Sequence, residues 1–329
     1  MQTITRVIFA LALAAATPAA LPQSTSTGSG QAYPSKPIRL VVGFTPGGGV
    51  DINARLLAPK LSEYLGQQVI VDNRPGAGTN IANEHVARSA PDGYTLLINT
   101  AAVAINMSLY KKVPFDTLRD FAAVSIFSVS PNILVVHASV PVKNVKELIA
   151  LARSRPGGLN FSSAGSGTTQ HLSGELFKVR TKTDIVHVPY KGTAPSMTAL
   201  ISGEVSLSFA NIPAIYSHIK SGRLRPIANL GPQRSAQLPD VPTMKEAGVS
   251  GVEVVVWYGV LAPANTPREI ISTLAGAIRK AAQAPDTRQR LLDQGAEPVG
   301  NSPEEFAKLL REEVTKWAEV VKVSGAKVD

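Results

Sequence analysis

Strand-like and helix-like runs alternate along almost the whole chain, and this alternation is the strongest constraint on its fold. Short apolar runs such as IRLVVGF, QQVIVD and YTLLINT are separated by segments in which apolar residues recur at helical spacing. Such a pattern is typical of a mostly parallel sheet with helices on both faces. The sequence therefore predicts an α/β fold.

The alternation comes in two units. The first ends with the strand-like run FAAVSIFSVS, and the second starts at NILVVHA and continues to RLRPIANL; the run VEVVVWYGVLAPA then leads into three helical stretches over 267–282, 287–294 and 303–323. We expect one α/β domain made of residues 33–130 and about 255–329, and a second made of residues 131–254. A ligand cleft is expected between them, beyond the carboxyl ends of the strands.

The N-terminus predicts export. Arg6 precedes the apolar run VIFALALAAATPAALP, which is typical of a signal peptide over about residues 1–20, and the small polar residues 21–32 predict a flexible linker. The chain has no cysteine, so disulfides, thiolate metal sites and a lipid-bearing cysteine are excluded. We therefore expect a periplasmic protein without a lipid anchor.

The charge favours small anions over nucleic acids. The chain carries 33 Lys and Arg against 24 Asp and Glu, a formal net charge of +9, but its basic residues are dispersed and are not interleaved with aromatic ones. A nucleic-acid partner is not expected, whereas a modest positive field would favour the entry of small anions.

A glycine-rich turn follows the first strand-like run, in VVGFTPGGGVDINARLL. It has neither the Gly-Lys-Ser/Thr ending of a phosphate-binding loop nor the G-x-G-x-x-G spacing of a dinucleotide site. Three glycines in a row allow an anion to approach the backbone N–H groups at a helix N-terminus. The alternative is an ordinary turn in which Asp51 caps the helix.

A second turn, in LNFSSAGSGTTQHLSGELF, adds hydroxyl groups and an imidazole. The G-x-S-x-G frame of a nucleophilic serine is absent around both Ser163 and Ser166. His171 falls in the first turn of the predicted helix, where the helix dipole favours a neutral imidazole that donates to a ligand. A packing role for His171 is the alternative.

The remaining polar residues give no sign of catalysis. The five histidines lack metal-binding spacing and the carboxylates form no close pair near the glycine turns, so we expect no metal, no cofactor and no catalytic residue. Two other strand-like runs are followed by polar or small residues that either line the cleft or belong to ordinary strand-to-helix connections: Tyr190, Lys191, Gly192 and Thr193 after one, and Thr100 after the other.

These residues together resemble the Bug family, the TctC-type extracytoplasmic solute receptors of tripartite tricarboxylate transporters. The resemblance runs from about Tyr33 to the C-terminal helices. It is carried by the segments YPSKPIRLVVGFTPGGGVDINARLLAPKLSEYLGQQVIVDNRPGAGTNIANEHVARSAPDGYTLL, FSSAGSGTTQHLSGELF, VPYKGTAPSMTALISGEV and LPDVPTMKEAG.

The resemblance implies a type II-like Venus-flytrap fold in which a ligand carboxylate is held between the two glycine-rich turns. In many relatives an aspartate follows the phenylalanine that here is Phe209, where this chain has Ala210 and Asn211. That aspartate could meet the ammonium of an amino acid, so amino-acid ligands are disfavoured, and Asn211 is expected among the ligand-binding residues. The implied ligand-binding residues are Thr45, Pro46, Gly47, Gly48 and Gly49 of the first turn, Ser163, Ala164, Gly165, Gly167, Thr168, Thr169 and His171 of the second, and Thr79, Asn80 and Thr100 near the variable part of the ligand.

We therefore predict a monomeric periplasmic receptor that binds a small organic acid and delivers it to integral-membrane transporter subunits. One alternative is an exported hydrolase or isomerase that uses Ser166 or His171. Another is a sensory receptor that presents its ligand to a signalling partner.

Overall fold

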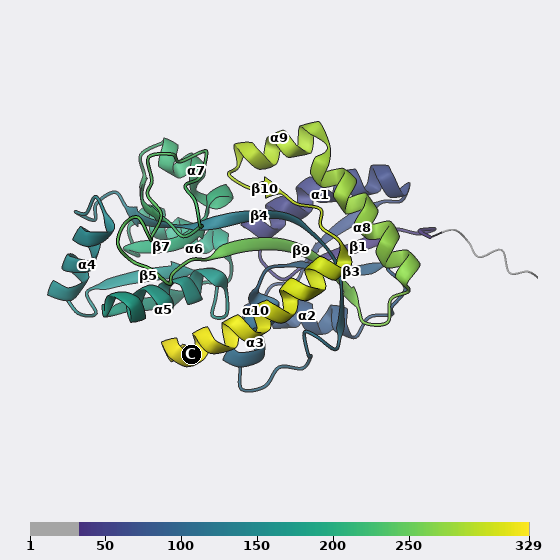
Figure 1. The fold of residues 1–329 in the computed structure, drawn as a ribbon, viewed down its shortest axis with the longest axis horizontal. Coiled ribbons are helices and arrows are strands. Elements are labelled where there is room, and N and C mark those ends of the chain that lie inside the picture. The colour runs from purple at the N-terminus through teal and green to yellow at the C-terminus, as the bar shows by residue number, and fades with distance from the viewer. Residues whose placement is uncertain (1–32, 329) are drawn as a thin grey trace, which may run out of the picture. The chain divides into compact units, whose positions relative to one another are not determined.

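The computed structural model describes residues 33–328, so the predicted signal peptide and linker lie outside the described residues. The order of its elements follows the predicted alternation of strands and helices (Figure 1). The N-terminal third contains β1 (Ile38–Val42), α1 (Gly49–Leu65), β2 (Val69–Asn73), the short 3-10 helix η1 (Ala77–Thr79), α2 (Asn80–Ala87), β3 (Thr95–Asn99) and α3 (Ala102–Leu109).

The rest of the chain continues the same pattern. The middle contains β4 (Phe121–His137), α4 (Val145–Ser154), β5 (Leu159–Ser163), α5 (Thr169–Thr181), β6 (Ile185–Pro189), α6 (Thr193–Ser202), β7 (Leu207–Asn211), α7 (Ile212–Lys220) and β8 (Leu224–Asn229). The C-terminal part contains β9 (Val255–Pro263), α8 (Arg268–Gln283), α9 (Pro285–Asp293), β10 (Glu297–Pro298) and α10 (Pro303–Ser324).

The strands form one mixed sheet in the order β2-β1-β3-β9-β4-β7-β5-β6, with β8 and β10 also paired to β4. We call β2, β1 and β3 the β1 side, and β7, β5, β6 and β8 the β5 side; β9 and β4 lie between them. Parallel pairs occur away from the centre, between β1 and its two neighbours and between β5 and its two neighbours. Every pair that involves β4 or β9 is antiparallel, so the expectation of a mostly parallel sheet is wrong.

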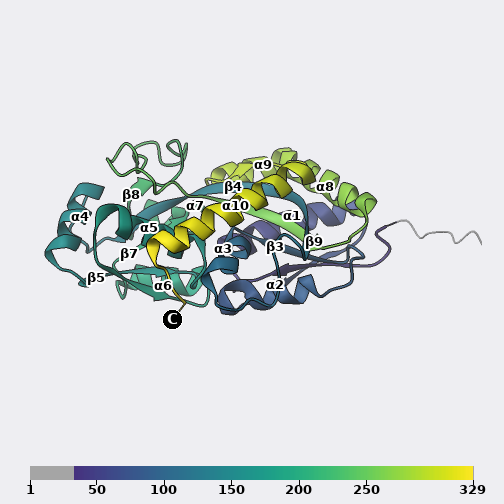
Figure 2. The same cartoon turned by 60° about the horizontal axis from the view of Figure 1, so that its bottom comes forward.

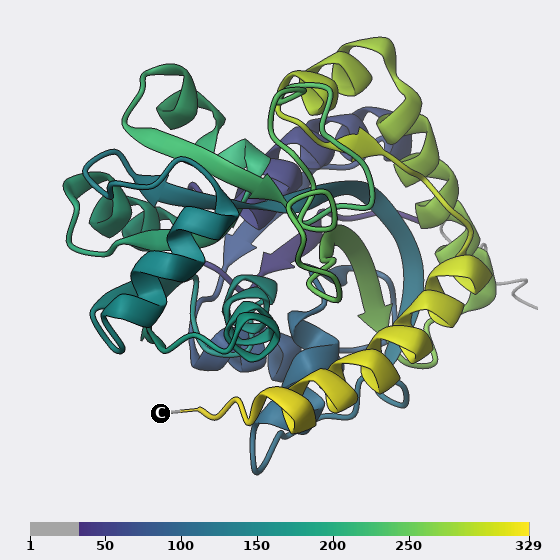
Figure 3. The ribbon, with the colours of Figure 1, turned by 60° about the vertical axis from the view of Figure 1, so that its left-hand side comes forward.

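The antiparallel centre follows from the path of the chain. β4 leads from the β1 side to the β5 side and β9 leads back, so two strands that cross in opposite directions pair with each other. Figure 3 shows both strands curving through the centre of the sheet. The predicted division into two domains, with boundaries near residues 130 and 255, stays a prediction.

β4 is a single strand of 17 residues, whereas the sequence pattern indicated two separate strands. Its first part, up to Pro131, pairs with β9, and its second part, from Asn132, pairs with β7 and β8. Pro131 and Asn132 resemble a turn in the sequence because both are uncommon in strands. In the structure they lie where β4 exchanges one set of neighbours for the other.

The C-terminal helix α10 contacts elements of both the β1 side and the β5 side. It begins with a capping box formed by Ser302 and Glu305 and ends at Gly325, whose left-handed backbone (φ 65°) caps the last turn. It packs on α3 and β4 and reaches α5 on the β5 side. Figures 1 and 2 show it extending from beside α8 toward α5.

A buried carboxylate joins α10 to β9. Glu313 is only 7% exposed, and its Oε2 accepts a hydrogen bond from Trp257 Nε1 (3.2 Å) and another from Trp317 Nε1 (2.8 Å). Lys316 lies 3.5 Å from the other carboxylate oxygen. Both indole N–H groups are therefore satisfied by one acceptor, as buried polar groups require.

We expect Glu313→Leu to lower the free energy of unfolding by about 2–4 kcal/mol, because it leaves two buried indole N–H groups without an acceptor. Denaturation in guanidinium chloride measures this loss. The neighbouring Glu312→Leu is the control, since Glu312 is exposed and its ion pair with Lys308 is long, at 3.8 Å. Equal stability of the two variants would contradict the assigned role of Glu313.

None of the helices within residues 33–328 combines the length and the apolar character that crossing a membrane requires.

Candidate functional site

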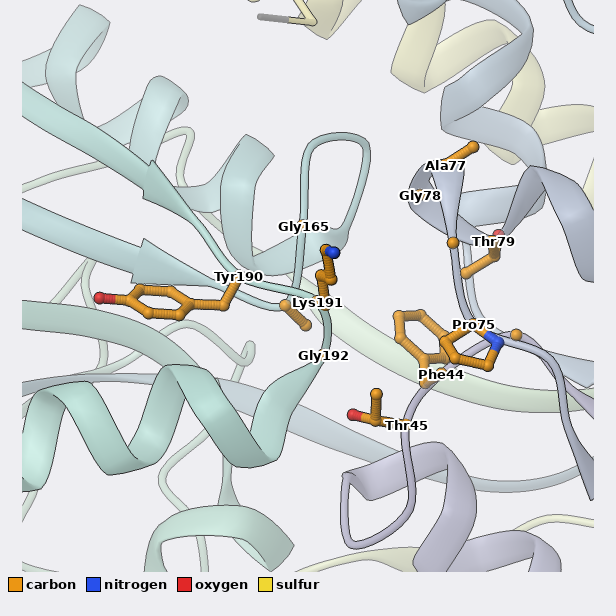
Figure 4. Close-up of a pocket in the computed structure, with 13 residues that line it drawn as sticks. Phe44, Thr45, Pro75, Ala77, Gly78, Thr79, Gly165, Tyr190, Lys191 and Gly192 are labelled. Atoms are coloured by element: carbon orange, nitrogen blue, oxygen red, sulfur yellow. The ribbon is translucent and has the colours of Figure 1, made fainter.

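The loops at the carboxyl ends of several strands enclose a large chamber of about 300 Å³. The loops after β1 and β2 contribute one wall and the loops after β5 and β6 contribute the other. Figure 4 shows these two walls facing each other. The lining residues are Gly43, Phe44, Thr45, Pro75, Gly76, Ala77, Gly78, Thr79, Ala164, Gly165, Tyr190, Lys191 and Gly192.

A small chamber of about 20 Å³ adjoins the large one and shares Phe44 and Ala164 with it. Its lining combines both predicted turns with the start of α6 and the ends of β3 and β7. The remaining lining residues are Gly48, Val50, Thr100, Thr168, Thr169, Gln170, Thr193, Asn211 and Val256.

The small chamber is bordered by the N-termini of five helices. It is lined by the first residues of α5 and α6 and by Gly48 and Val50 at the start of α1; Asn211 immediately precedes α7, and Thr100 lies two residues before α3. The first N–H groups of a helix have no partner within the helix, and the helix dipole makes this end positive. Several such ends around one small space form an environment for an anion.

In the first glycine-rich turn, α1 is not capped by Asp51 as the alternative reading of the sequence expected. The N-cap of α1 is Gly48, and Asp51 lies in the first helical turn. Its carboxylate accepts hydrogen bonds from Gly47 N (2.9 Å), Arg55 Nε (2.9 Å) and Asn73 Nδ2 (2.9 Å). Burial favours the neutral acid, but these donors outweigh it and hold the Asp51 pKa below its usual range.

Asp51 thus fixes the turn and takes up one of its backbone donors. The N–H of Gly47 is bonded to Asp51, whereas those of Gly48 and Val50 donate to no acceptor among the described residues. Both of these residues line the small chamber. The donors left for an anion are therefore those nearest the chamber.

The second turn is held mainly by its own side chains. Thr168 is the N-cap of α5, and its Oγ1 accepts from His171 N (3.3 Å). Gln170 Oε1 accepts from Ala164 N (2.7 Å). The N–H groups of Thr169 and Gln170 have no acceptor within residues 33–328, and both residues line the small chamber.

The β1 and β5 sides approach each other closely around the chambers. Tyr110 Oη donates to Ser166 O at 3.3 Å. A Cβ built on Gly48 would lie 3.2 Å from Thr193 Cβ, and one built on Gly192 would overlap Thr45 Oγ1. Gly192 also has φ +128°, which side chains rarely adopt. Position 192 therefore requires glycine, whereas a side chain at position 48 would make a tight contact with Thr193, because the two walls meet there.

The structure brings together most of the predicted binding residues, but not all of them. The two chambers are lined by Thr45, Gly48, Thr79, Thr100, Ala164, Gly165, Thr168, Thr169, Tyr190, Lys191 and Asn211. Neither lining includes Pro46, Gly47, Gly49, Asn80, Ser163, Gly167 or His171.

Several of these outlying residues have structural partners instead. Asn80 Oδ1 accepts from Asn106 Nδ2 (2.8 Å), and a Cβ on Gly167 would overlap Asn106 Oδ1. Gly49 lies against Asn211 and Tyr258. Asn211 Oδ1 and Tyr258 Oη are buried and have no hydrogen-bond partner among the described residues.

His171 lies on the far side of the second turn. It is 2% exposed, its Nδ1 accepts from Gly167 N (3.3 Å), and its ring stacks on His187 with centroids 4.1 Å apart. Burial and the charge of Lys178 lower the His171 pKa to about 4, which favours a neutral imidazole for reasons other than the helix dipole. Its position matches the packing alternative.

The structure pairs a different serine with a histidine. Ser163 Oγ lies 2.7 Å from His187 Nε2, but Ser163 is fully buried and lines neither chamber. Ser166 and His171 share no hydrogen bond within the described residues. No group of three or more potential metal-binding side chains occurs within residues 33–328.

The loop from Pro75 to Gly78 is the main part of the lining that sequence reasoning missed. Ala77, Gly78 and Thr79 all have positive φ angles, of 47°, 59° and 81°. Thr79 Oγ1 accepts from Asn83 Nδ2 (3.2 Å) and Asn99 Nδ2 (3.3 Å), which holds this strained turn in place. The glycines of RPGAG were the available signal. Gly43, Phe44, Val50, Gln170 and Val256 were also missed, whereas Gly192 and Thr193, expected either at the cleft or in an ordinary connection, are in the lining.

Comparison with known proteins decides the family. The model of the tripartite tricarboxylate transporter family receptors, TctC, matches residues 53–326. The chain belongs to the TctC family. BugT of Bordetella pertussis is 39% identical over 302 residues, which cover 91% of this chain and 93% of BugT.

Solved structures of TctC-type proteins have the same fold. Rpa4515 of R. palustris, solved with adipate, is 38% identical with a TM-score of 0.87, covering 90% of this chain and all of that one. MatC (Rpa3494) from Rhodopseudomonas palustris, solved with malate, is 32% identical with a TM-score of 0.84, covering 88% of this chain and all of that one. The predicted α/β fold of a periplasmic binding protein is confirmed, and the family and fold are those of solute receptors.

The stacked histidines predict a loss of stability in mild acid. Burial lowers the pKa of His187 to about 3, with smaller effects of His171 and Lys178, while histidines of the unfolded chain titrate near 6.5. Between pH 6.5 and pH 4 the unfolded state binds more protons, so the free energy of unfolding falls as the pH falls. We expect a slope of at most about 1.4 kcal/mol per pH unit for each histidine.

Urea denaturation at a series of pH values measures this slope. His187→Phe keeps a ring between Phe161 and His171, which stack on its two sides, but removes one titrating group. The variant should lose stability less steeply between pH 6.5 and pH 4. An unchanged slope would mean that His187 is not held neutral by the fold.

Proposed function

We propose that the chain is a periplasmic receptor that captures a small carboxylate in the two chambers and delivers it to a tripartite tricarboxylate-type membrane transporter. The observation that carries the proposal is the convergence of five helix N-termini on the small chamber. The adipate and malate held by the two solved relatives support a carboxylate as the ligand.

The backbone donors give a physical basis for capture. Gly48, Val50, Thr169 and Gln170 line the small chamber with N–H groups that have no acceptor within the described residues. A hydrogen bond to a charged group contributes about 1.5–3 kcal/mol. Four such bonds give about 6–12 kcal/mol before the costs of association, whereas a micromolar complex needs about 8 kcal/mol net, so contacts in the large chamber must contribute as well.

Closure around the ligand provides the signal that a transporter could read. The donors come from α1 on the β1 side and from α5 on the β5 side, so a ligand gains all of them only when both sides are close together. We propose that the two sides are the predicted domains, that β4 and β9 are the hinge, and that the receptor works as a monomer.

The function is tested by mixing the purified protein with a panel of carboxylates, with calorimetry as the measure of binding and chromatography as the measure of product. We expect saturable binding of at least one carboxylate with no loss of the bound compound over time. Turnover of any bound compound would instead favour the exported-enzyme alternative. Absence of binding across the panel would overturn the proposal.

A substitution at Gly48 should separate binding from folding. The Gly48 backbone (φ −86°, ψ 169°) is accessible to any residue, but a side chain there points at Thr193 across the cleft. We expect Gly48→Val to weaken binding of the best carboxylate by about tenfold or more, because the new side chain fills the small chamber and keeps the two walls apart. The melting temperature of the ligand-free protein should change little.

Gly276→Val is the matched control, because no atom lies within 4 Å of a Cβ built at Gly276 in α8. It should bind the same carboxylate as the unsubstituted protein does. Unchanged affinity in folded Gly48→Val protein would remove the small chamber from the binding site.

A further inference from the structure

The second glycine-rich turn is bonded to a pair of stacked histidines. The rings of His171 and His187 have centroids 4.1 Å apart, and Phe161 stacks on the other side of His187 at 4.8 Å. Neither histidine lines the small or the large chamber. Each is nevertheless bonded to a residue of the turn, so the pair can act on the turn without touching a ligand.

His171 takes up one backbone N–H group of the turn. Its Nδ1 accepts from Gly167 N at 3.3 Å, so its ring proton lies on Nε2. The backbone N–H of His171 donates in turn to Thr168 Oγ1 at 3.3 Å. The N–H of Gly167 is therefore satisfied by the imidazole and is not offered to a ligand.

The hydroxyl of Ser163 joins His187 to the turn. It accepts from Gly165 N (3.1 Å) and lies 2.7 Å from His187 Nε2 and 3.2 Å from Gly165 O. Gly165 O already accepts from Thr168 N (3.3 Å) and Thr168 Oγ1 (2.8 Å), which occupies both of its lone pairs. The single hydroxyl proton of Ser163 is therefore directed to His187 Nε2, and this nitrogen must be an unprotonated acceptor.

Both rings thus act as neutral acceptors, and each carries its proton on its other nitrogen. Burial holds the pKa of each imidazole well below its usual range, in agreement with neutral rings. His171 and His187 both line a cavity of about 430 Å³, which is large enough for water molecules that accept the two ring protons. The charged groups on the wall of this cavity are Glu175, Lys178, Asp184 and Lys327.

The hydrogen bonds of the turn decide which of its N–H groups remain for a ligand. Bonds to side chains take up the N–H groups of Ala164, Gly165 and Gly167. Those of Thr169 and Gln170 have no acceptor among the described residues, and both residues line the small chamber. Loss of a histidine acceptor would free a different N–H group and change the shape of the turn.

We propose that His171 and His187 are positioning residues for the ligand: as neutral hydrogen-bond acceptors they set the conformation of the second turn, and thereby the affinity for a carboxylate. This inference rests on the proposed function, since it concerns the same turn. It differs from a packing role, because it assigns the effect to one lone pair on each ring and not to the bulk of the ring.

Two substitutions of His187 separate the acceptor from the ring. His187→Phe keeps a ring between Phe161 and His171 but removes the acceptor of the Ser163 hydroxyl. His187→Gln loses the stacked ring but keeps an acceptor oxygen close to the place of Nε2. By calorimetry, we expect His187→Phe to weaken the best carboxylate about tenfold and His187→Gln to stay within about threefold of the unsubstituted protein. The melting temperatures of the ligand-free variants should rank the other way, with His187→Phe higher.

His171 allows a second comparison of the same kind. The Oδ1 of an asparagine lies close to the place of a histidine Nδ1, so His171→Asn can still accept from Gly167 N, whereas His171→Leu cannot. We expect His171→Leu to weaken the carboxylate about tenfold and His171→Asn to stay within about threefold. This pair decides the question even where a His187 variant fails to fold.

A double-mutant cycle tests whether His187 acts through Ser163. Ser163→Ala removes the hydroxyl that joins His187 to Gly165. In this background, His187→Phe should weaken binding by no more than about twofold further, because the bond on which it acts is already lost.

His137→Phe and His137→Gln are the matched controls. His137 Nδ1 also lies beside a serine hydroxyl, 2.7 Å from Ser139 Oγ, but neither of these residues lines a chamber. Both variants should bind the carboxylate as tightly as the unsubstituted protein does.

The inference is overturned if His187→Phe binds as tightly as His187→Gln or more tightly, since the ring and not the acceptor would then matter. The same holds for His171→Leu against His171→Asn, and for fully additive effects of Ser163→Ala and His187→Phe. In each case the unsubstituted protein still binds a carboxylate, so the proposed function stands. Failure of the unsubstituted protein to bind any carboxylate would overturn the proposed function itself, and the two failures are therefore distinguishable.

Discussion

The antiparallel pairing of β4 with β9 is the interaction on which the rest of the structure depends. These two strands carry the chain between the β1 and β5 sides, and each pairs with a neighbour of a strand that leads into a glycine-rich turn. β9 pairs with β3 beside β1, and β4 pairs with β7 beside β5. The positions of both turns, and hence of both chambers, follow from this central pair.

Much of the fold could be predicted because local patterns determine it. The helical pattern over 303–323 predicts α10 to within one residue of its observed bounds. The direction of β4 and β9 could not be predicted, since it depends on pairing between residues more than a hundred positions apart. Pro131 resembles the end of a strand in the sequence for the same reason. Whether a proline ends a strand depends on its neighbours in the sheet.

The site was predictable where it is made of backbone and unpredictable where it depends on which way a side chain points. Glycine turns after strands correctly indicated the walls of the chambers. His171 and Tyr190 lie on those turns, but one is stacked on His187 and the other is bonded to Glu204. Spacing along the chain contains no signal for either contact, and the glycines of RPGAG are the one signal for the strained loop before Thr79.

The two indoles bound to Glu313 give the molecule a built-in optical reporter. Trp257 and Trp317 are the only tryptophans in the sequence, and both are buried beside the same carboxylate. Trp257 belongs to β9, one of the two crossing strands, and Trp317 to a helix that contacts both sides of the sheet. The intrinsic fluorescence of the protein therefore comes from side chains of β9 and α10 that share one carboxylate. A change in the surroundings of β9 changes this emission, so no attached dye is needed to detect it.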